Sequence, residues 1–133
     1  MYIIICLDDN NGLAFNHRRQ SQDRIVAEDI RKTVGEKKLW ITDYSRKLFQ
    51  AVSNLEISEN PKEEAKKGEY VFQELETLDT DDEQIEQFII YRWNRVYPAD
   101  VSVEIGAEWK LTETEEFSGF SHEKITKEIY CRE

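Results

Sequence analysis

The sequence has few basic residues, no signal-peptide pattern and no long hydrophobic run. It holds 18 lysines and arginines against 28 aspartates and glutamates, which gives a formal net charge of -10 at pH 7. This excess of negative charge disfavours nonspecific binding to nucleic acid or to a membrane surface. The opening apolar run, Tyr2–Leu7, is too short for a membrane span or for the core of a signal peptide. We therefore expect a soluble, cytoplasmic protein with no membrane contact and no nucleic-acid partner.

Cysteine and histidine are equally scarce. Cys6 and Cys131 fall in predicted strands without Cys-x-x-Cys spacing, so we expect two reduced, buried thiols, with a disulfide as the alternative. His17 and His122 are far apart, and the acidic segment 74–86 has no EF-hand spacing. For that segment we expect a solvated turn and a helix start, and we predict no metal site.

Strand and helix patterns alternate along the chain and predict one α/β domain over residues 1–133. Tyr2–Leu7 is apolar on both faces, as is typical of a central strand covered on both sides. Ser21 offers a helix cap, and apolar residues at helical spacing predict a helix over 22–33 that ends at Gly35. Further strands are expected at 38–42, 55–57, 69–73, 87–97, 101–105, 109–117 and 124–131, with short helices after Thr42 and at 61–68. These elements predict a mixed sheet of about six to eight strands, mostly parallel, with an antiparallel C-terminal strand pair and helices on both faces.

The order of these elements and several short motifs resemble the dihydrofolate reductase family. A strand runs into the turn DDNNG, a long strand contains FIIYRW and is followed by VYPAD, and the closing strands contain WKL and IYCR. The resemblance covers most of the chain and implies a shortened dihydrofolate reductase-like fold. It also implies NADPH as the cofactor and folate reduction as the activity.

Several positions depart from the family pattern. The Leu-Pro-Trp segment before the first helix is replaced by RRQS at 18–21. A Gly-Gly pair that lets the backbone approach the cofactor pyrophosphate is replaced by Gln73 and Glu74. Residues 50–69 have room for only part of the family's central cofactor-binding segment. These departures argue against ordinary folate reduction and leave NADPH binding open.

The one concentration of positive charge lies in the loop after the first strand. Residues 17–24 contain Arg18, Arg19 and Arg24 beside His17, and arginine forks suit phosphate or carboxylate groups. A loop at the carboxyl end of a central strand is where α/β folds bind ligands. We therefore predict that the three arginines bind a small anionic ligand. The alternative is that they pair with the nearby acidic segment.

The resemblance assigns further residues to this site. Asp23 corresponds to the family's pterin-binding acid and could donate a proton, although an acid at the start of a helix can also act as a cap alone. Tyr91 would face Asp23 across the site and contact it. Ser45 and Arg46 would hold the cofactor phosphates at a helix N-terminus.

Two loop residues carry separate expectations. Asp100 resembles a family acid that holds the loop over the active site, and we expect it to close a lid through a salt bridge to Arg18 or Arg19. His122 lies in the loop before the last strand, where we expect a helical or surface role rather than a catalytic one.

Three functions follow from these observations. The first is a binding or regulatory module, or an enzyme of undefined reaction, that holds a nucleotide- or pterin-like anion. The second is an NADPH-dependent reductase with an altered site. The third is a metal-independent ribonuclease that uses His17 and His122 as acid and base, because the zinc motif His-x-His-x-Asp-His of ribonuclease Z is absent. An exposed sheet edge would also allow a homodimer.

Overall fold

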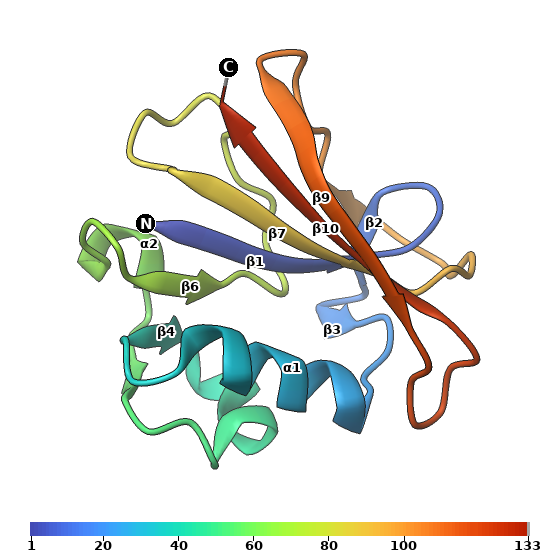
Figure 1. Ribbon diagram of the computed structural model, residues 1–133, viewed down its shortest axis with the longest axis horizontal. Coiled ribbons are helices and arrows are strands. Elements are labelled where there is room, and N and C mark those ends of the chain that lie inside the picture. Colours follow the sequence, from blue (N-terminus) through green and yellow to red (C-terminus); the bar gives the residue numbers. More distant parts are fainter. Residues whose placement is uncertain (133) are drawn as a thin grey trace.

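The central element is β1 (Tyr2–Leu7), in the middle of a seven-stranded sheet with the order β5-β4-β6-β1-β7-β10-β9 (Figure 1). The computed structural model describes residues 1–132. The other strands of this sheet are β4 (Leu39–Ile41), β5 (Leu55–Ile57), β6 (Tyr70–Phe72), β7 (Gln87–Arg92), β9 (Trp109–Phe117) and β10 (Ile125–Arg132). β1 pairs in parallel with β6 and β7, and β10 runs antiparallel between β7 and β9. The predicted mixed sheet with an antiparallel C-terminal pair is confirmed.

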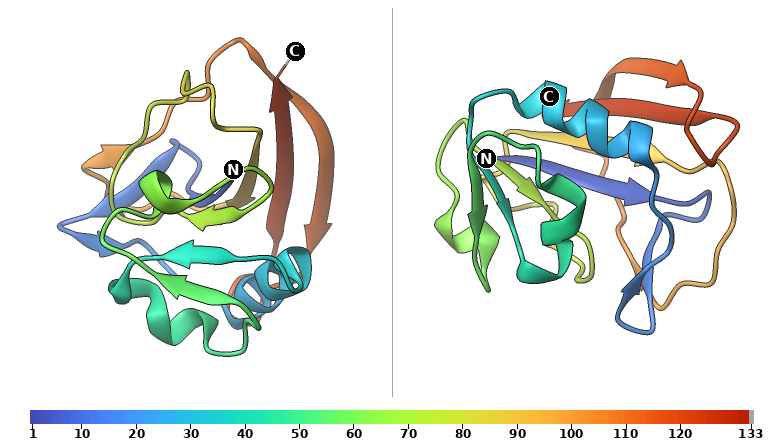
Figure 2. Two further views of the ribbon diagram at one scale, coloured as in Figure 1. Left: turned by 90° about the vertical axis from the view of Figure 1, so that its left-hand side faces the viewer. Right: turned by 90° about the horizontal axis from the view of Figure 1, so that it is seen from below.

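β1 is apolar on both faces because both faces are covered. Ile3, Ile4 and Ile5 are fully buried. Ile4 belongs to the core that lies under the first two helices, whereas Ile3 and Ile5 pack on the opposite side with Phe88 and Trp109. The helices are α1 (Arg24–Val34), the 3-10 helix η1 (Asp43–Phe49) and the short α2 (Pro61–Glu64). Figure 2 shows α1 lying along the sheet from two further sides.

A second, three-stranded sheet has the order β3-β2-β8 and is not predicted by the sequence patterns. Its strands are β2 (Gly12–Phe15), β3 (Arg18–Arg19) and β8 (Val101–Ser102). Gly12 lets two backbone segments approach closely, because a Cβ at this position would lie 2.7 Å from the Cβ of Ala99. The expected basic loop after β1 is therefore a hairpin, and its second strand carries Arg18 and Arg19.

Several element boundaries differ from the predictions, and α2 and β8 are both shorter than expected. Asp23, rather than Ser21, caps α1, since its carboxylate accepts a hydrogen bond from the backbone N–H of Ile25. β7 ends at Arg92 instead of continuing to residue 97, because the backbone of Asn94 adopts a φ of 58°, which a strand cannot continue through. Segment 74–86 forms turns instead of a helix start.

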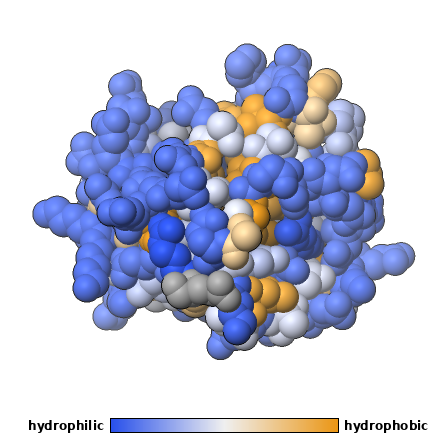
Figure 3. All heavy atoms as spheres, turned by 90° about the horizontal axis from the view of Figure 1, so that it is seen from above, coloured by the Kyte–Doolittle hydropathy of each residue, from blue (hydrophilic) through white to orange (hydrophobic). Residues whose placement is uncertain are grey.

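β9 lies at one edge of the large sheet, and its side chains are exposed from Lys110 to Glu116. Figure 3 shows one face of the molecule, on which hydrophilic side chains surround smaller apolar areas. None of the helices within residues 1–132 has the length and apolar character needed to cross a membrane.

Candidate functional site

A narrow cleft opens at the carboxyl ends of the parallel strands. It is lined by Cys6 of β1, Phe72 of β6 and Trp93 just after β7, together with the first turns of α1. Open α/β sheets bind ligands at this edge. The cleft has a volume of about 30 Å³, which is room for little more than a water molecule. A ring-sized group does not fit into it in this conformation.

A wider groove adjoins the cleft and lies between α1, η1 and the β9–β10 loop (residues 118–124). Its volume is about 520 Å³. Ala27, Leu48 and Val52 give it an apolar lining, and Phe120 contributes an exposed ring. Its charged lining residues are the cations Arg24, Arg31 and Lys47 and the carboxylates Asp23 and Glu28. In a protein with a net charge of -10, this excess of cations over carboxylates favours a ligand of negative charge.

The three basic side chains of the groove differ in whether they form an ion pair with an acidic residue. Arg31 pairs with Glu28, one turn earlier on α1. The guanidinium of Arg24 lies 4.1 Å from the centre of the Phe120 ring, and Arg24 forms no ion pair with any residue from 1 to 132. Lys47 likewise has no acidic partner in that part of the chain. The two cations without an acidic partner are therefore available to an anion in the groove.

Arg19 is engaged with an acidic residue that also lines the cleft. Its Nε and Nη2 donate to the carboxylate of Glu74 at 2.6 and 3.1 Å. The hydroxyl of Ser45 donates to the same carboxylate at 2.6 Å. Pairing with the acidic segment, the alternative left open by the sequence, therefore holds for Arg19. Its neighbour Arg18 is exposed and forms no ion pair with residues 1–132.

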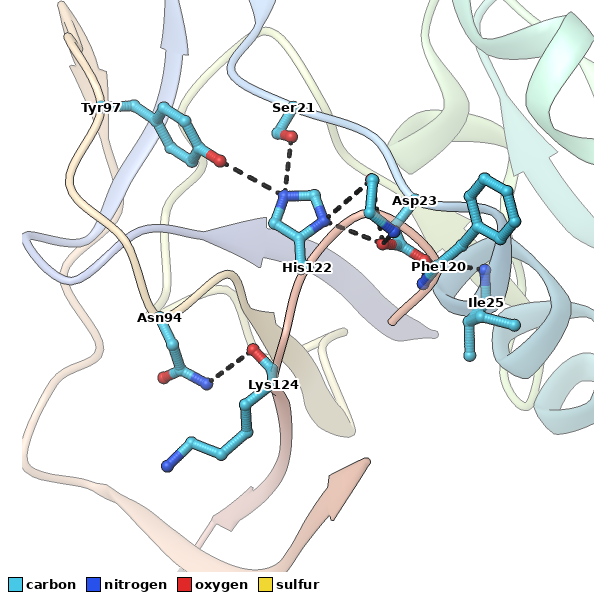
Figure 4. A network of polar contacts seen from close by, with 9 residues as sticks. Ser21, Asp23, Ile25, Asn94, Tyr97, Phe120, His122 and Lys124 are labelled. Atoms are coloured by element: carbon cyan, nitrogen blue, oxygen red, sulfur yellow. Dashed lines mark hydrogen bonds and ion pairs between the residues drawn. The ribbon is translucent and has the colours of Figure 1, made fainter. Parts of the chain in front are cut away.

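Asp23 joins the start of α1 to the β9–β10 loop (Figure 4). Its Oδ1 accepts from the backbone N–H groups of Ile25 and Phe120, both at 2.9 Å. Its Oδ2 accepts from the backbone N–H of Ser121 at 2.9 Å and from His122 Nδ1 at 2.8 Å. Burial alone would raise the pKa of Asp23, but these hydrogen bonds together hold it well below its usual range. The carboxylate is therefore ionised at neutral pH.

His122 is buried, and the expectation of a surface role is wrong. Its ring stacks on Trp93 at a centroid distance of 4.7 Å, and its side chain is 4% exposed. Because the ionised Asp23 can only accept, Nδ1 of His122 carries a hydrogen, and Nε2 of the neutral ring is an acceptor. Two hydroxyls lie near that nitrogen, Ser21 Oγ at 3.0 Å and the Tyr97 oxygen at 3.2 Å (Figure 4).

The low pKa of Asp23 predicts a stability contribution that depends on pH. Because the folded pKa lies below the unfolded value of about 3.9, the contribution is complete above about pH 5 and is lost as the pH falls toward the folded pKa. The difference in free energy of unfolding between wild type and Asp23→Asn should therefore shrink between about pH 5 and pH 2. Urea titrations across that range measure it. A difference that is constant with pH would contradict this assignment.

Among solved structures, a dihydrofolate reductase from Enterococcus faecalis in complex with NADP(H) and RAB-propyl resembles the chain along nearly its whole length. The TM-score is 0.65 over 98% of this chain and 95% of that one, at 10% sequence identity. The chain has a dihydrofolate reductase-like fold. No protein-family model matches the sequence, and no curated protein matches it. A likeness at this level of identity concerns the fold alone.

Within the dihydrofolate reductase-like fold, the predicted contact between Tyr91 and Asp23 is wrong. The Tyr91 hydroxyl donates to Asp29 Oδ2 at 2.6 Å, and Lys127 Nζ lies 2.9 Å from the same oxygen. Asp29 lies within α1 and reaches Tyr91 on β7, whereas Asp23 caps the helix and is turned toward the β9–β10 loop. Burial raises the pKa of the fully buried Tyr91.

The predicted salt bridge from Asp100 to Arg18 or Arg19 is also wrong. Asp100 Oδ2 accepts from the backbone N–H of Asn16 at 3.0 Å and so holds the turn between β2 and β3. Arg19 is taken by Glu74, and no salt bridge joins Asp100 to another described residue. This acid ties the two loops together through the backbone rather than through an arginine.

The helix start that the dihydrofolate reductase resemblance assigns to cofactor phosphates is acidic. Arg46 pairs with Asp43 at 2.7 Å, and Ser45 is buried against Glu74. A neighbouring groove of about 370 Å³ lies next to α2 and the end of β6. Its charged lining residues are Glu59, Lys62, Glu63, Glu74 and Glu76. Four carboxylates against one ammonium group do not fit the phosphates of NADPH.

The remaining predicted groups do not converge. His17 is exposed in the turn between β2 and β3, whereas His122 is buried. No group of three metal-ligating side chains occurs within residues 1–132. Cys6 and Cys131 are free thiols, as predicted, although both are half-buried rather than buried. Burial, followed by the negative charge of Glu74, raises the pKa of Cys6, so its thiol stays protonated.

Sequence patterns did not predict the observed contacts of three residues that line or organise the site. Glu74 is the first residue of the acidic segment, so the pairing alternative pointed to its neighbourhood. Lys47 follows the predicted helix start by a few residues and has no motif around it. His122 was considered only as an acid or base partner of His17, because its observed partner Asp23 is 99 residues away in the sequence.

Proposed function

We propose that the protein binds a small ligand with an apolar body and an anionic end in the groove between α1 and η1. The observation that carries this proposal is the combination of an apolar lining with two cations, Arg24 and Lys47, that have no acidic partner among residues 1–132. A carboxylate or phosphate would replace the water around these cations, while the apolar part of the ligand covers Leu48 and Val52. Flat anions such as pterin carboxylates and nucleotides have these properties.

The volumes of the two spaces restrict how such a ligand lies. The groove holds about 520 Å³ and the cleft about 30 Å³. A ring therefore lies in the groove, and at most a small substituent enters the cleft toward Ser21. Of the arginines predicted from the sequence, this proposal keeps Arg24. It makes no use of Arg18, which is exposed on the hairpin.

The acidic surface near α2 argues against the reductase alternative. NADPH carries several phosphate charges, and the corresponding groove presents carboxylates from Glu59, Glu63 and Glu76. The carboxylate of Glu74 already accepts a hydrogen bond from the hydroxyl of Ser45 and forms an ion pair with the guanidinium of Arg19. A dinucleotide would have to displace this ion pair and approach like charges, so we expect no measurable NADPH binding.

The proposal is tested by titrating the protein with folate, pterin-6-carboxylate and adenosine monophosphate in a calorimeter. We expect at least one of these anions to bind, and Lys47→Ala to weaken it about tenfold, since a hydrogen bond to a charged group contributes about 1.5–3 kcal/mol when well formed. Lys32→Ala is the matched control, because Lys32 is an exposed lysine of α1 outside the groove. Absence of binding by all three anions, or equal affinities for the two variants, would exclude the groove as their site.

A further inference from the structure

Ser21, His122 and Asp23 form a continuous hydrogen-bonded line (Figure 4). Ser21 lines the cleft, and Asp23 lines both the cleft and the groove. Ser21 Oγ lies 3.0 Å from His122 Nε2, and His122 Nδ1 lies 2.8 Å from Asp23 Oδ2. A serine, a histidine and a buried aspartate in this order are the arrangement that activates a serine hydroxyl for attack on a carbonyl. The residues come from two loops that are far apart in the sequence.

The two inner members of this line are held rigidly and away from water. The Asp23 side chain is fully buried, and that of His122 is 4% exposed. Trp93 stacks on the imidazole at an interplanar angle of 26°, which fixes the ring plane. Since Asp23 accepts the Nδ1–H, the lone pair on Nε2 is directed toward the two hydroxyls, and Ser21 can donate its hydrogen to it.

The outer member is accessible. Ser21 is only half-buried and lines the cleft. It precedes α1 by three residues, on the segment that leads into the helix. Tyr97, whose hydroxyl is 3.2 Å from Nε2, can accept a hydrogen from the imidazolium once Ser21 has given up its proton.

We propose that Ser21 is the nucleophile of an ester-hydrolysing site, with His122 as general base and Asp23 as the residue that orients it. Ser21 Oγ bonds to the ester carbonyl carbon while its proton passes to His122 Nε2. The bond from that carbon to the alcohol oxygen then breaks, and His122 gives the proton to the leaving alkoxide. A water molecule then attacks the carbonyl carbon of the acyl group and gives a proton to His122. The bond from that carbon to Ser21 Oγ breaks, and His122 returns the proton to Oγ.

The substrate class rests on the proposed function of the groove, whereas the nucleophile does not. The cleft at Ser21 admits a carbonyl but no ring. The groove next to it, which shares Gln22 and Leu48 with the cleft, presents Lys47 to an anionic group. The preferred substrate is therefore a small ester whose acyl or alkyl part carries a carboxylate.

The experiment compares two esters and one covalent probe on the full chain. The esters are 4-nitrophenyl acetate, which is neutral, and mono-4-nitrophenyl succinate, which carries a carboxylate; the probe is a fluorophosphonate read by intact mass. We expect one phosphonyl group on Ser21 and hydrolysis that drops at least about 100-fold in Ser21→Ala and in His122→Gln. Ser118→Ala is the matched control, since Ser118 is an exposed serine of the same loop as His122.

Two readouts separate catalysis from a structural role. Wild-type hydrolysis should rise with pH, because a general base acts only in its unprotonated form, and this rise should be absent in His122→Gln. Thermal unfolding should show that Ser21→Ala remains folded. No labelling of the wild type, or equal rates for wild type and folded Ser21→Ala, would overturn the proposal. Equal rates for the two esters in both wild type and Lys47→Ala, with dependence on Ser21 retained, would support the nucleophile and overturn the substrate class.

Discussion

Asp23→Ala is expected to lower the free energy of unfolding by about 3–5 kcal/mol, the typical cost of removing one partner from a buried charged cluster. The Asp23 side chain is fully buried. Its carboxylate accepts hydrogen bonds from three backbone N–H groups and from His122 Nδ1. Alanine would leave these donors buried without an acceptor and would also remove the cap of α1. The β9–β10 loop should detach from the helix as a result.

Urea unfolding of Asp23→Ala is compared with that of Asp9→Ala, because both variants remove one negative charge. Asp9 is an exposed acid whose side chain accepts no hydrogen bond within residues 1–132, so its replacement should change the stability by less than about 0.5 kcal/mol. Proton exchange at the backbone amide of Phe120 should accelerate only in Asp23→Ala. Equal losses of stability in the two variants would show that Asp23 does not hold the loop.

Arg19→Ala is expected to cost about 2–3 kcal/mol, somewhat less than the full cost of breaking a buried pair, because the arginine is partly exposed. The side chain of Glu74 is 8% exposed and that of Arg19 is 22% exposed. Without the guanidinium, the carboxylate of Glu74 would keep only the hydroxyl of Ser45 as a close partner. Arg19 should therefore contribute to stability in the absence of a ligand.

The neighbouring Arg18 supplies the control for this prediction. It lies on the same strand, has the same charge and is exposed, so Arg18→Ala should leave the unfolding midpoint nearly unchanged. Both variants are measured by urea unfolding without ligand. If Arg18→Ala proved as destabilising as Arg19→Ala, the pair with Glu74 would not be the cause of the loss.

The sequence predicts those strands in which the order of apolar and polar side chains fits only one type of secondary structure. β1 is apolar on both faces, and β9 has the predicted bounds, because strand patterns of this length have few alternatives. The end of β7 could not be predicted, because FIIYRWNRVY is strand-like throughout and only the φ of Asn94 interrupts it. The small sheet was missed because its strands have two to four residues, although β8 lies within the strand expected at 101–105.

The site was harder to predict than the fold because its contacts are long-range. Arg19 had several acidic residues to choose from, and the sequence does not say that Glu74 would be the one. Asp23 was recognised, but its partner was taken to be Tyr91, which instead reaches Asp29. Asp23 and Asp29 are six residues apart in the sequence. Which of the two acids meets Tyr91 depends on how α1 packs on the sheet, and the sequence alone does not give that packing.

The exposed edge strand β9 has a consequence for how copies of the protein meet. An edge of this length, with unpaired backbone groups, is a template for adding a strand from another chain. Here the edge carries Glu113, Glu115 and Glu116, which would bring like charges together wherever two such edges approached. We therefore expect these glutamates to oppose pairing between two such edges. At low salt, this edge should therefore remain unpaired even at high protein concentration. Added salt screens the charges, so association through β9 should appear first at high salt.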